Sequence, residues 1–146
     1  MRLFFLTLSS ATVLFAGAAQ ADAIADRQAI MKDMGRSVGV IAPMIKGEKP
    51  FDAAAALTAL ETIEADTKKL DFDALFPAGS DQGKTEASPK IWESKDDFVK
   101  NIEKIQTDAA AAVAAKPQDL DALKPAFQQV AANCGACHKA FRIKKN

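Results

Sequence analysis

Both cysteines and the only histidine of this chain lie close together near its C-terminal end. The segment 133–142 has the sequence NCGACHKAFR and contains Cys134, Cys137 and His138. On an α-helix, residues three or four positions apart share one face, so both thiols and the imidazole would project from the same side. Two thiols one helical turn apart can form thioethers with the two vinyl groups of a haem, and the adjacent imidazole can bind its iron. The pattern therefore predicts one covalent haem c, held by Cys134 and Cys137, with His138 as the proximal iron ligand.

Three other interpretations account for this segment less well. A redox-active Cys-x-x-Cys pair sits at a helix N-terminus, where the helix dipole lowers the thiol pKa, but here the pair lies at the end of the last helical segment. A structural zinc site needs four ligands, and this segment offers three unless carboxylates complete the set. A disulfide would use both cysteines and leave His138 without a role. Haem attachment uses all three side chains.

The elements that must position this motif are four segments with helical periodicity. They span about 23–45, 51–70, 94–115 and 118–142. In the last of them, apolar residues alternate at steps of three and four, and this stripe includes both cysteines. Prolines and glycines in residues 71–94 indicate a long connection. No segment alternates as a strand does, so we expect an all-α, up-down-up-down four-helix bundle with the haem near the C-terminal helix.

Local signals refine the expected helix ends. Asp52 is a predicted N-cap of the second helix, and Ser94, with Asp97 three residues later, is a predicted N-cap of the third. Pro125 lies inside the fourth span, where it either kinks the helix or occupies the first turn of a helix that starts near Leu123. In the long connection, five apolar side chains are expected to pack on the bundle: Phe72, Leu75, Phe76, Ile91 and Trp92.

The N-terminal segment has the pattern of a secretory signal peptide. Arg2 gives a positive start, residues 3–19 carry no charge, and residues 19–21 (AQA) match an A-x-A cleavage site. We therefore expect residues 1–21 to be removed, leaving a four-helix domain of residues 22–146 in the periplasm. A retained membrane anchor is the alternative, but the apolar stretch is short and interrupted by Ser, Thr and Gly. No other segment is apolar enough to insert into a membrane.

The charge balance argues against one broad class of partner. The chain has 19 Lys and Arg and 19 Asp and Glu, so its formal net charge is zero with His neutral. Loss of the predicted signal removes one Arg and no acid, which leaves 18 basic and 19 acidic side chains. A near-neutral chain gives no electrostatic reason to expect nucleic-acid binding.

The ligand on the other side of the iron decides what the haem does. A thioether there closes the site and raises the reduction potential, whereas an empty position leaves iron that binds small gases. The chain has no second histidine, so the candidates in the mature chain are Met31, Met34 and Met44. Met31 and Met34 both lie on the apolar stripe of the first helix, and spacing alone does not choose between them. A methionine on such a stripe also commonly fills a core.

Small residues on the first and last helices allow two interpretations. A glycine inside a helix costs about 1 kcal/mol relative to alanine, so it either gives clearance to the porphyrin or is simply tolerated. The residues concerned are Gly35, Gly39, Ala131, Ala132, Gly135 and Ala136.

Several segments that accompany the motif point to a known family. They are CGACHKAFR at 134–142, IAPMIKGEKPFD at 41–52, PKIW at 89–92 and the pair Arg27-Gln28. With a Cys-x-x-Cys-His motif near the C-terminus, the whole mature chain resembles the class II c-type cytochromes, the cytochrome c-prime family. The sequence IMKDMGR, followed by KGEKPFD, is most similar to the low-spin branch, cytochrome c-556. The resemblance implies a four-helix bundle.

This resemblance also implies roles for individual residues. Met31, four positions after Arg27, matches the residue that faces the distal side of the haem, which is an iron-binding methionine in the cytochrome c-556 branch. Met31 is thus the implied sixth ligand, and Met34 a packing residue. Arg27 and Gln28 match side chains near a haem propionate, and Arg142 matches an arginine near the proximal face. Family members often pair through their first two helices, which implies a homodimer.

Together these inferences predict a soluble periplasmic electron carrier with one haem c, which exchanges electrons with redox protein partners and transforms no substrate. A basic cluster near the C-terminus complements the helix dipole and could dock an acidic partner: Lys139, Arg142, Lys144 and Lys145. The alternative is a five-coordinate haem protein that binds nitric oxide or carbon monoxide. A peroxidase or reductase would need a distal acid-base group, and the only histidine is already used as a ligand.

Overall fold

The structure is a computed structural model and describes residues 15–143, with side chains from residue 20 onward. Most of the predicted signal peptide lies outside these residues, as do Lys144 and Lys145 of the predicted basic cluster. Within residues 15–143, no helix is both long enough and apolar enough to cross a membrane.

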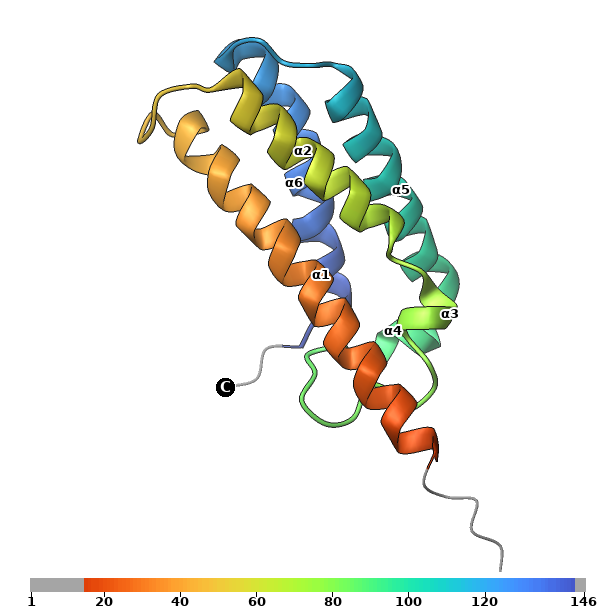
Figure 1. The fold of residues 1–146 in the computed structure, drawn as a ribbon. Coiled ribbons are helices and arrows are strands. Elements are labelled where there is room, and N and C mark those ends of the chain that lie inside the picture. The colour runs from red at the N-terminus through yellow and green to blue at the C-terminus, as the bar shows by residue number, and fades with distance from the viewer. Residues whose placement is uncertain (1–14, 144–146) are drawn as a thin grey trace, which may run out of the picture.

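Four long helices pack along one another (Figure 1): α1 (Phe15–Ile45), α2 (Ala53–Lys68), α5 (Lys95–Ala114) and α6 (Leu120–Phe141). Helix α1 contacts α2, α2 contacts α5, α5 contacts α6, and α6 returns to α1. Short turns join α1 to α2 and α5 to α6, so each of these pairs runs antiparallel. The predicted all-α, up-down-up-down four-helix bundle is confirmed.

The connection between α2 and α5 contains two single-turn helices that the sequence did not predict. They are α3 (Phe72–Leu75) and α4 (Lys90–Glu93). The predicted packing of this connection on the bundle is confirmed. Leu75, Phe76 and Ile91 belong to a buried cluster, and the partly buried Phe72 and Trp92 pack against it.

The helix ends confirm the predicted cap positions at Asp52 and Ser94, although only Asp52 caps with its side chain. Asp52 caps α2, since its Oδ1 accepts a hydrogen bond from the backbone N–H of Ala55 at 3.0 Å. Ser94 occupies the N-cap position of α5, and its carbonyl oxygen accepts from the backbone N–H of Phe98 at 3.0 Å, but its side chain makes no capping hydrogen bond. Its backbone N–H also closes α4 by donating to the carbonyl oxygen of Lys90 at 2.9 Å.

One helix start differs from the predicted one. Helix α1 begins at Phe15 rather than near Ala23, and the alanine-rich sequence between them has a high helix propensity. Helix α6 begins at Leu120, close to the predicted start at about residue 118, and the side chain of Asp119 caps its first turn. Pro125 consequently lies beyond the first turn of α6, so the alternative start near Leu123 is wrong.

The apolar side chains form two clusters. One lies among the four long helices and includes Ile41, Leu60, Leu123 and Val130. The other lies beside the connection and includes Met34, Leu70, Phe76, Phe98 and Phe141. In the second cluster, the ring centroid of Phe98 lies 4.8 Å from that of Phe76 and 5.1 Å from that of Phe141. This aromatic cluster packs α5, α6 and the connection together at the end of the bundle that holds the motif.

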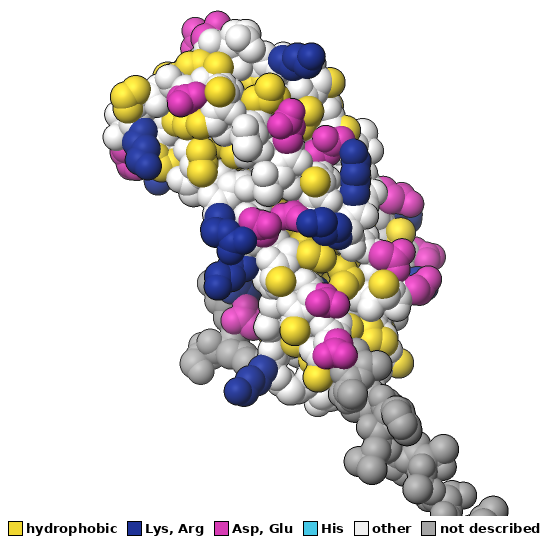
Figure 2. Space-filling model, viewed as in Figure 1, with side chains coloured by type: hydrophobic (Ala, Val, Ile, Leu, Met, Phe, Trp, Pro, Cys, Tyr) yellow, Lys and Arg dark blue, Asp and Glu magenta, His cyan; other side chains and the backbone are white. Residues whose placement is uncertain are grey.

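Basic and acidic side chains are interspersed on the face of the molecule shown in Figure 2. An electrostatic footprint for nucleic acid consists of basic side chains clustered on one face or along one helix. This face has no extended surface of one sign, in agreement with the formal net charge of zero.

Candidate haem site

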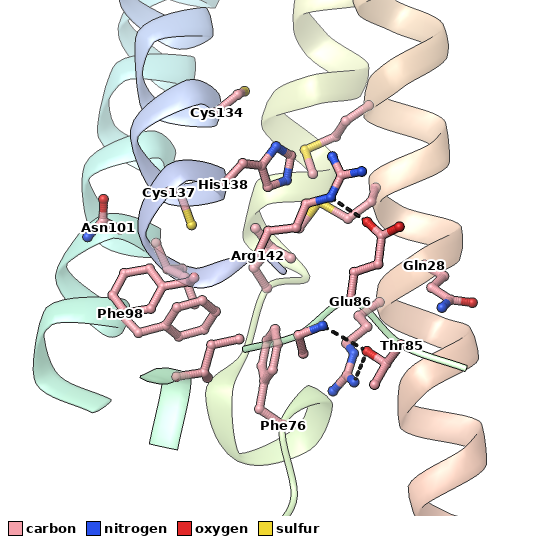
Figure 3. Close-up of a pocket in the computed structure, with 18 of the residues that line it drawn as sticks. Gln28, Phe76, Thr85, Glu86, Phe98, Asn101, Cys134, Cys137, His138 and Arg142 are labelled. Atoms are coloured by element: carbon pink, nitrogen blue, oxygen red, sulfur yellow. Dashed lines mark hydrogen bonds and ion pairs between the residues drawn. The ribbon is translucent and has the colours of Figure 1, made fainter. Parts of the chain in front are cut away.

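A cavity of about 720 Å³ lies between α1, α5, α6 and the connection (Figure 3). Its wall is largely apolar and includes Leu70, Phe76, Ile91, Phe98, Ile102 and Ile105. Cofactor sites in proteins are typically concave and mostly apolar, with volumes of roughly 300–1,000 Å³. The cavity therefore has the size and lining expected for a large apolar cofactor.

The three side chains of the Cys-x-x-Cys-His motif line this cavity from α6. Figure 3 shows Cys134, Cys137 and His138 projecting from one side of that helix. The two cysteines are free thiols, and Cys134 Sγ donates a weak hydrogen bond to the carbonyl oxygen of Val130 at 3.6 Å. The side chains thus share one face, as their spacing predicts, and both thiols remain free to react.

Burial sets the protonation state of this cluster. Burial raises the pKa of the Cys134 thiol. Burial, together with the electrostatic effect of the neighbouring Cys134, raises the pKa of Cys137 to about 11. A redox-active pair needs a thiolate of low pKa, so these thiols do not have the character of a thioredoxin-like site. Burial and the positive charge of Arg142 lower the pKa of His138. A lowered pKa favours the neutral imidazole, which is the form that binds metals.

A zinc site finds no support in the part of the chain that the structure describes. A structural zinc ion is held by four side chains in tetrahedral geometry. Among residues 15–143, no group of three or more His, Cys, Asp or Glu side chains is arranged to hold a metal ion. The carboxylates that would have to complete such a site with Cys134, Cys137 and His138 do not gather there.

Two methionines of α1 line the cavity, and their surroundings differ. Met34 is 7% exposed and packs in the aromatic cluster beside the connection. Met31 is 37% exposed and also lines the cavity. Met44, the third candidate, is buried in the other cluster and is not among the cavity residues. The core environment of Met34 fits the packing role implied for it, whereas the side chain of Met31 has no core position.

Arg27, for which a haem propionate is the implied partner, already has several protein partners. The residue is 5% exposed, and its guanidinium lies over the ring of Phe76, with Cζ 5.0 Å from the ring centroid. Nη1 donates to the carbonyl oxygen of Leu75 at 3.1 Å and to Ser80 Oγ at 2.9 Å. Nη2 donates to Thr85 Oγ1 at 2.7 Å and to the carbonyl oxygen of Ser80. Arg27 therefore anchors the connection to α1, and the propionate contact stays a prediction.

Residues 80–88 of the connection, which we call the strap, also contact α6. The strap residue Glu86 accepts a hydrogen bond from Arg142 Nε through its Oε2. The backbone N–H of Ile143 donates to the carbonyl oxygen of Glu86 at 2.9 Å, and that of Ser88 donates to the carbonyl oxygen of Phe141 at 2.9 Å. Arg142 thus lies in the cavity wall and is paired with a carboxylate of the strap, and its implied position near the proximal face of the haem stays a prediction.

Gln28, the other residue with an implied propionate contact, binds the strap from α1. Its Nε2 donates to the carbonyl oxygen of Lys84 at 2.7 Å. Figure 3 shows Gln28 on α1 beside the strap residues Thr85 and Glu86. Both Gln28 and Arg27 line the cavity, but their side-chain hydrogen bonds in the structure go to the strap and its neighbours.

A polar network beside the motif was not predicted. Asp108 of α5 is 8% exposed and accepts hydrogen bonds through Oδ2 from Lys104 Nζ and Asn133 Nδ2, each at 2.6 Å. Its Oδ1 accepts from Gln129 Nε2 at 3.2 Å. These bonds from Lys104 and Asn133 lower the pKa of Asp108. The network links α5 to α6 at Asn133, directly before Cys134. Its one signal in the sequence is Asp108, an acidic residue inside the apolar stripe of its helix.

The small residues on α1 and α6 lie outside the cavity wall. A side chain added at Gly35, Gly39 or Gly135 would meet no other part of the protein within 4 Å. None of the small residues considered in the sequence lines the cavity.

The residues present fit a haem c better than any other group considered. The motif places two free thiols and a neutral imidazole on one wall of an apolar cavity. The opposite helix, α1, contributes the thioether of Met31, which is not packed in a core. This donor set matches covalent haem attachment with one histidine ligand and one methionine available for the second axial position.

Comparison with known proteins agrees with this site. The family model for Cytochrome C' matches residues 22–142. The chain is 44% identical to cytochrome c-556 from Agrobacterium fabrum, over 82% of this chain and 80% of that protein. It is also 44% identical to cytochrome c' from Rhodopseudomonas palustris, over the full length of both chains. A solved nitric oxide complex of a cytochrome c prime mutant from Alcaligenes xylosoxidans matches with a TM-score of 0.76 and 34% identity, covering 88% of this chain and 98% of that one. The chain belongs to the cytochrome c-prime family, and it is a c-type cytochrome whose cofactor is covalently attached haem c.

Proposed function

We propose that this cytochrome is a periplasmic electron carrier, with Cys134 and Cys137 as haem attachment points and His138 and Met31 as axial iron ligands. The observation that carries the proposal is that His138 on α6 and Met31 on α1 line the same cavity. Met34 is held in a buried cluster, which leaves Met31 as the methionine free to bind. When bound, the haem supplies an iron that changes between the ferric and ferrous states, at a potential that a methionine ligand raises.

The protein's own residues would prepare the site in three ways. The raised pKa values of Cys134 and Cys137 keep both thiols protonated at neutral pH until they are joined to the cofactor. The lowered pKa of His138 favours the neutral imidazole that binds iron. The apolar wall, with Phe98 and Ile102 among its members, excludes water from one side of the cavity, and burial of this kind is one of the factors that set a haem potential.

Transfer of electrons, rather than transformation of a substrate, fits the polar groups of the cavity wall. A peroxidase-type reaction needs an acid-base group at the distal side. The two arginines of the wall, Arg27 and Arg142, both have protein partners in the described part of the chain. We therefore propose that the physiological partners are redox proteins of the same compartment, reached after removal of the signal peptide. A homodimer remains part of the proposal.

A second function, binding of nitric oxide or carbon monoxide, is supported by a specific observation. The Met31 side chain is 37% exposed and is not fixed by core packing, so it is free to leave the distal position as well as to occupy it. The curated relatives at 44% identity carry both names, cytochrome c-556 and cytochrome c'. A solved relative is a complex with nitric oxide.

The visible absorption spectrum of the matured protein tests the proposal. We expect low-spin ferric and ferrous spectra that carbon monoxide changes little or slowly. Met31→Ala is expected to give high-spin iron, a lower reduction potential and rapid binding of carbon monoxide. Met34→Ala is the matched control on the same helix, and it is expected to lower stability while the iron stays low-spin. A high-spin parent protein that binds carbon monoxide at once would refute Met31 ligation and favour gas binding.

A further inference from the structure

The strap, residues 80–88, connects the two helices that carry the proposed iron ligands. At one end it is held by α1, because Arg27 donates to Ser80 and Thr85. At the other end it is held by α6 and the residues that follow it, through the pairs Glu86–Arg142 and Ala87–Arg142. Because α1 and α6 both line the cavity, the strap provides a link between them that does not depend on what fills the cavity.

The side-chain contacts at the two ends of the strap differ in burial, and burial decides which of these contacts are the stronger. At the α1 end, Arg27, Ser80 and Thr85 are 5%, 0% and 4% exposed. Hydrogen bonds between a charged donor and buried acceptors are stronger than the average, and removing one partner leaves the other unsatisfied. At the α6 end, the side chains of Arg142 and Glu86 are 49% and 43% exposed. An ion pair so exposed contributes little, so the side-chain contacts at the α1 end are the stronger ones, while two backbone hydrogen bonds hold the α6 end.

Thr85 is the residue at which the link to α1 can be broken with least damage. Its Oγ1 accepts hydrogen bonds from Arg27 Nη2 at 2.7 Å and from the backbone N–H of Ala87 at 3.1 Å. The hydroxyl therefore joins the buried guanidinium to the part of the strap that continues toward Arg142. Thr85 lines the cavity, yet it is not among the side chains proposed to hold the haem or its iron.

We propose that the strap fixes α1 relative to α6 and so limits access of small ligands to the distal side of the haem, with Thr85 as its positioning residue. The inference rests on the proposed function, in which Met31 of α1 occupies the distal position. A protein that binds a ligand only in a minor open state binds it in proportion to the population of that state. The hydrogen bond from Arg27 to Thr85 is present in the closed arrangement and is lost when the strap leaves α1, so it lowers the population of the open one.

The test is the rate at which carbon monoxide binds to the ferrous holoprotein in stopped-flow measurements. Thr85→Val keeps the shape of the side chain and removes the hydroxyl, and we expect it to bind carbon monoxide at least tenfold faster than the parent. Thr85→Ser restores the hydroxyl and is expected to lie within about twofold of the parent. Thr107→Val, at an exposed position of α5 outside the cavity wall, is the matched control and is expected to have no effect. A rate for Thr85→Val within twofold of the parent overturns the proposal.

Amide hydrogen exchange of the same holoproteins gives a second readout that does not involve gas binding. The N–H of Ser80, a fully buried residue at the α1 end of the strap, donates to the carbonyl oxygen of Pro77 at 3.1 Å. We expect this amide to exchange at least tenfold faster in Thr85→Val than in the parent, because this end of the strap leaves α1. Faster binding of carbon monoxide with unchanged exchange at Ser80 would mean that the strap had not left α1, and would also overturn the proposal.

The outcomes separate the strap from the proposed function. A low-spin parent whose Thr85→Val variant binds carbon monoxide no faster leaves the electron-carrier proposal standing and removes the strap proposal. A high-spin parent removes Met31 ligation. In that case the ratio of the Thr85→Val rate to the parent rate, together with the exchange of the Ser80 amide, still decides whether the strap limits access.

Discussion

Replacing Arg27 by lysine distinguishes an anchor of the connection from a side chain that serves only a haem propionate. The guanidinium makes four hydrogen bonds to protein acceptors, on Leu75, Ser80 and Thr85. A lysine keeps the positive charge, but its single ammonium group cannot reproduce the planar fork of donors. If attraction of a carboxylate were the main role, Arg27→Lys would leave stability nearly unchanged. If the anchor is the main role, most of the hydrogen bonds are lost.

The expected size of this effect follows from the burial of the site. Arg27 is 5% exposed and the Ser80 acceptors are fully buried. Hydrogen bonds to a charged group contribute about 1.5–3 kcal/mol each and are not additive, so we expect a loss of about 2–4 kcal/mol of unfolding free energy. For a chain of this size, that corresponds to a fall of roughly 10 °C in Tm.

Thermal unfolding of the holoprotein, followed by far-ultraviolet circular dichroism, measures this difference. Arg36→Lys is a suitable control, because Arg36 is an exposed residue of the same helix that pairs only with Asp33 in the described structure. We expect its Tm to stay within about 2 °C of the parent, since exposed ion pairs contribute roughly 0–1 kcal/mol. An Arg27→Lys protein as stable as the Arg36→Lys control would refute the role of Arg27 as an anchor of the connection.

Three further predictions concern the other side chains of the site. The lowered pKa of Asp108 means that its contribution to stability is present above its unfolded pKa of about 3.9 and is lost as the pH falls through the lower folded value. Tm measured against pH should therefore fall more steeply below about pH 4 in the parent than in Asp108→Asn, and parallel curves would contradict this. Phe98→Ala removes a 5% exposed ring packed between Phe76 and Phe141, and should cost about 3–5 kcal/mol in urea unfolding. A cost below about 1 kcal/mol would show that the aromatic cluster does not stabilise this end of the bundle. Replacing both Cys134 and Cys137 by serine should abolish the haem that remains on the chain in a denaturing gel, and haem retained there would rule out these attachment points.

The sequence alone was sufficient for the features that depend on local spacing. Cys134, Cys137 and His138 lie within little more than one helical turn, so their common face follows from helix geometry without knowledge of the rest of the fold. The four long helices likewise follow from apolar periodicity, and the N-cap at Asp52 follows from the preference of its side chain for a free backbone N–H. These inferences succeed because each depends on residues close together in the chain.

Helix ends and the connection were less predictable, because more than one local arrangement competes there. Ser94 is shared between two helices: its backbone N–H closes α4, its carbonyl oxygen begins α5, and its side chain does not cap α5. The strap has no periodicity, and the hydrogen bonds that hold it on α1 and α6 join residues far apart in the sequence. No pattern in residues 71–94 indicates which distant side chains will bind them.

What the sequence determined by itself is the attachment motif and the bundle that carries it, since both are written in spacings of three and four residues. What only the tertiary structure decided is how α1 faces that motif. Met31 and Met34 are equivalent by spacing, and they differ only because Met34 is enclosed by side chains from α5, α6 and the connection while Met31 lies at the open part of the cavity. The partners of Arg27 were decided in the same way, because a buried guanidinium binds the acceptors that the folded chain brings to it, however far apart they lie in the sequence.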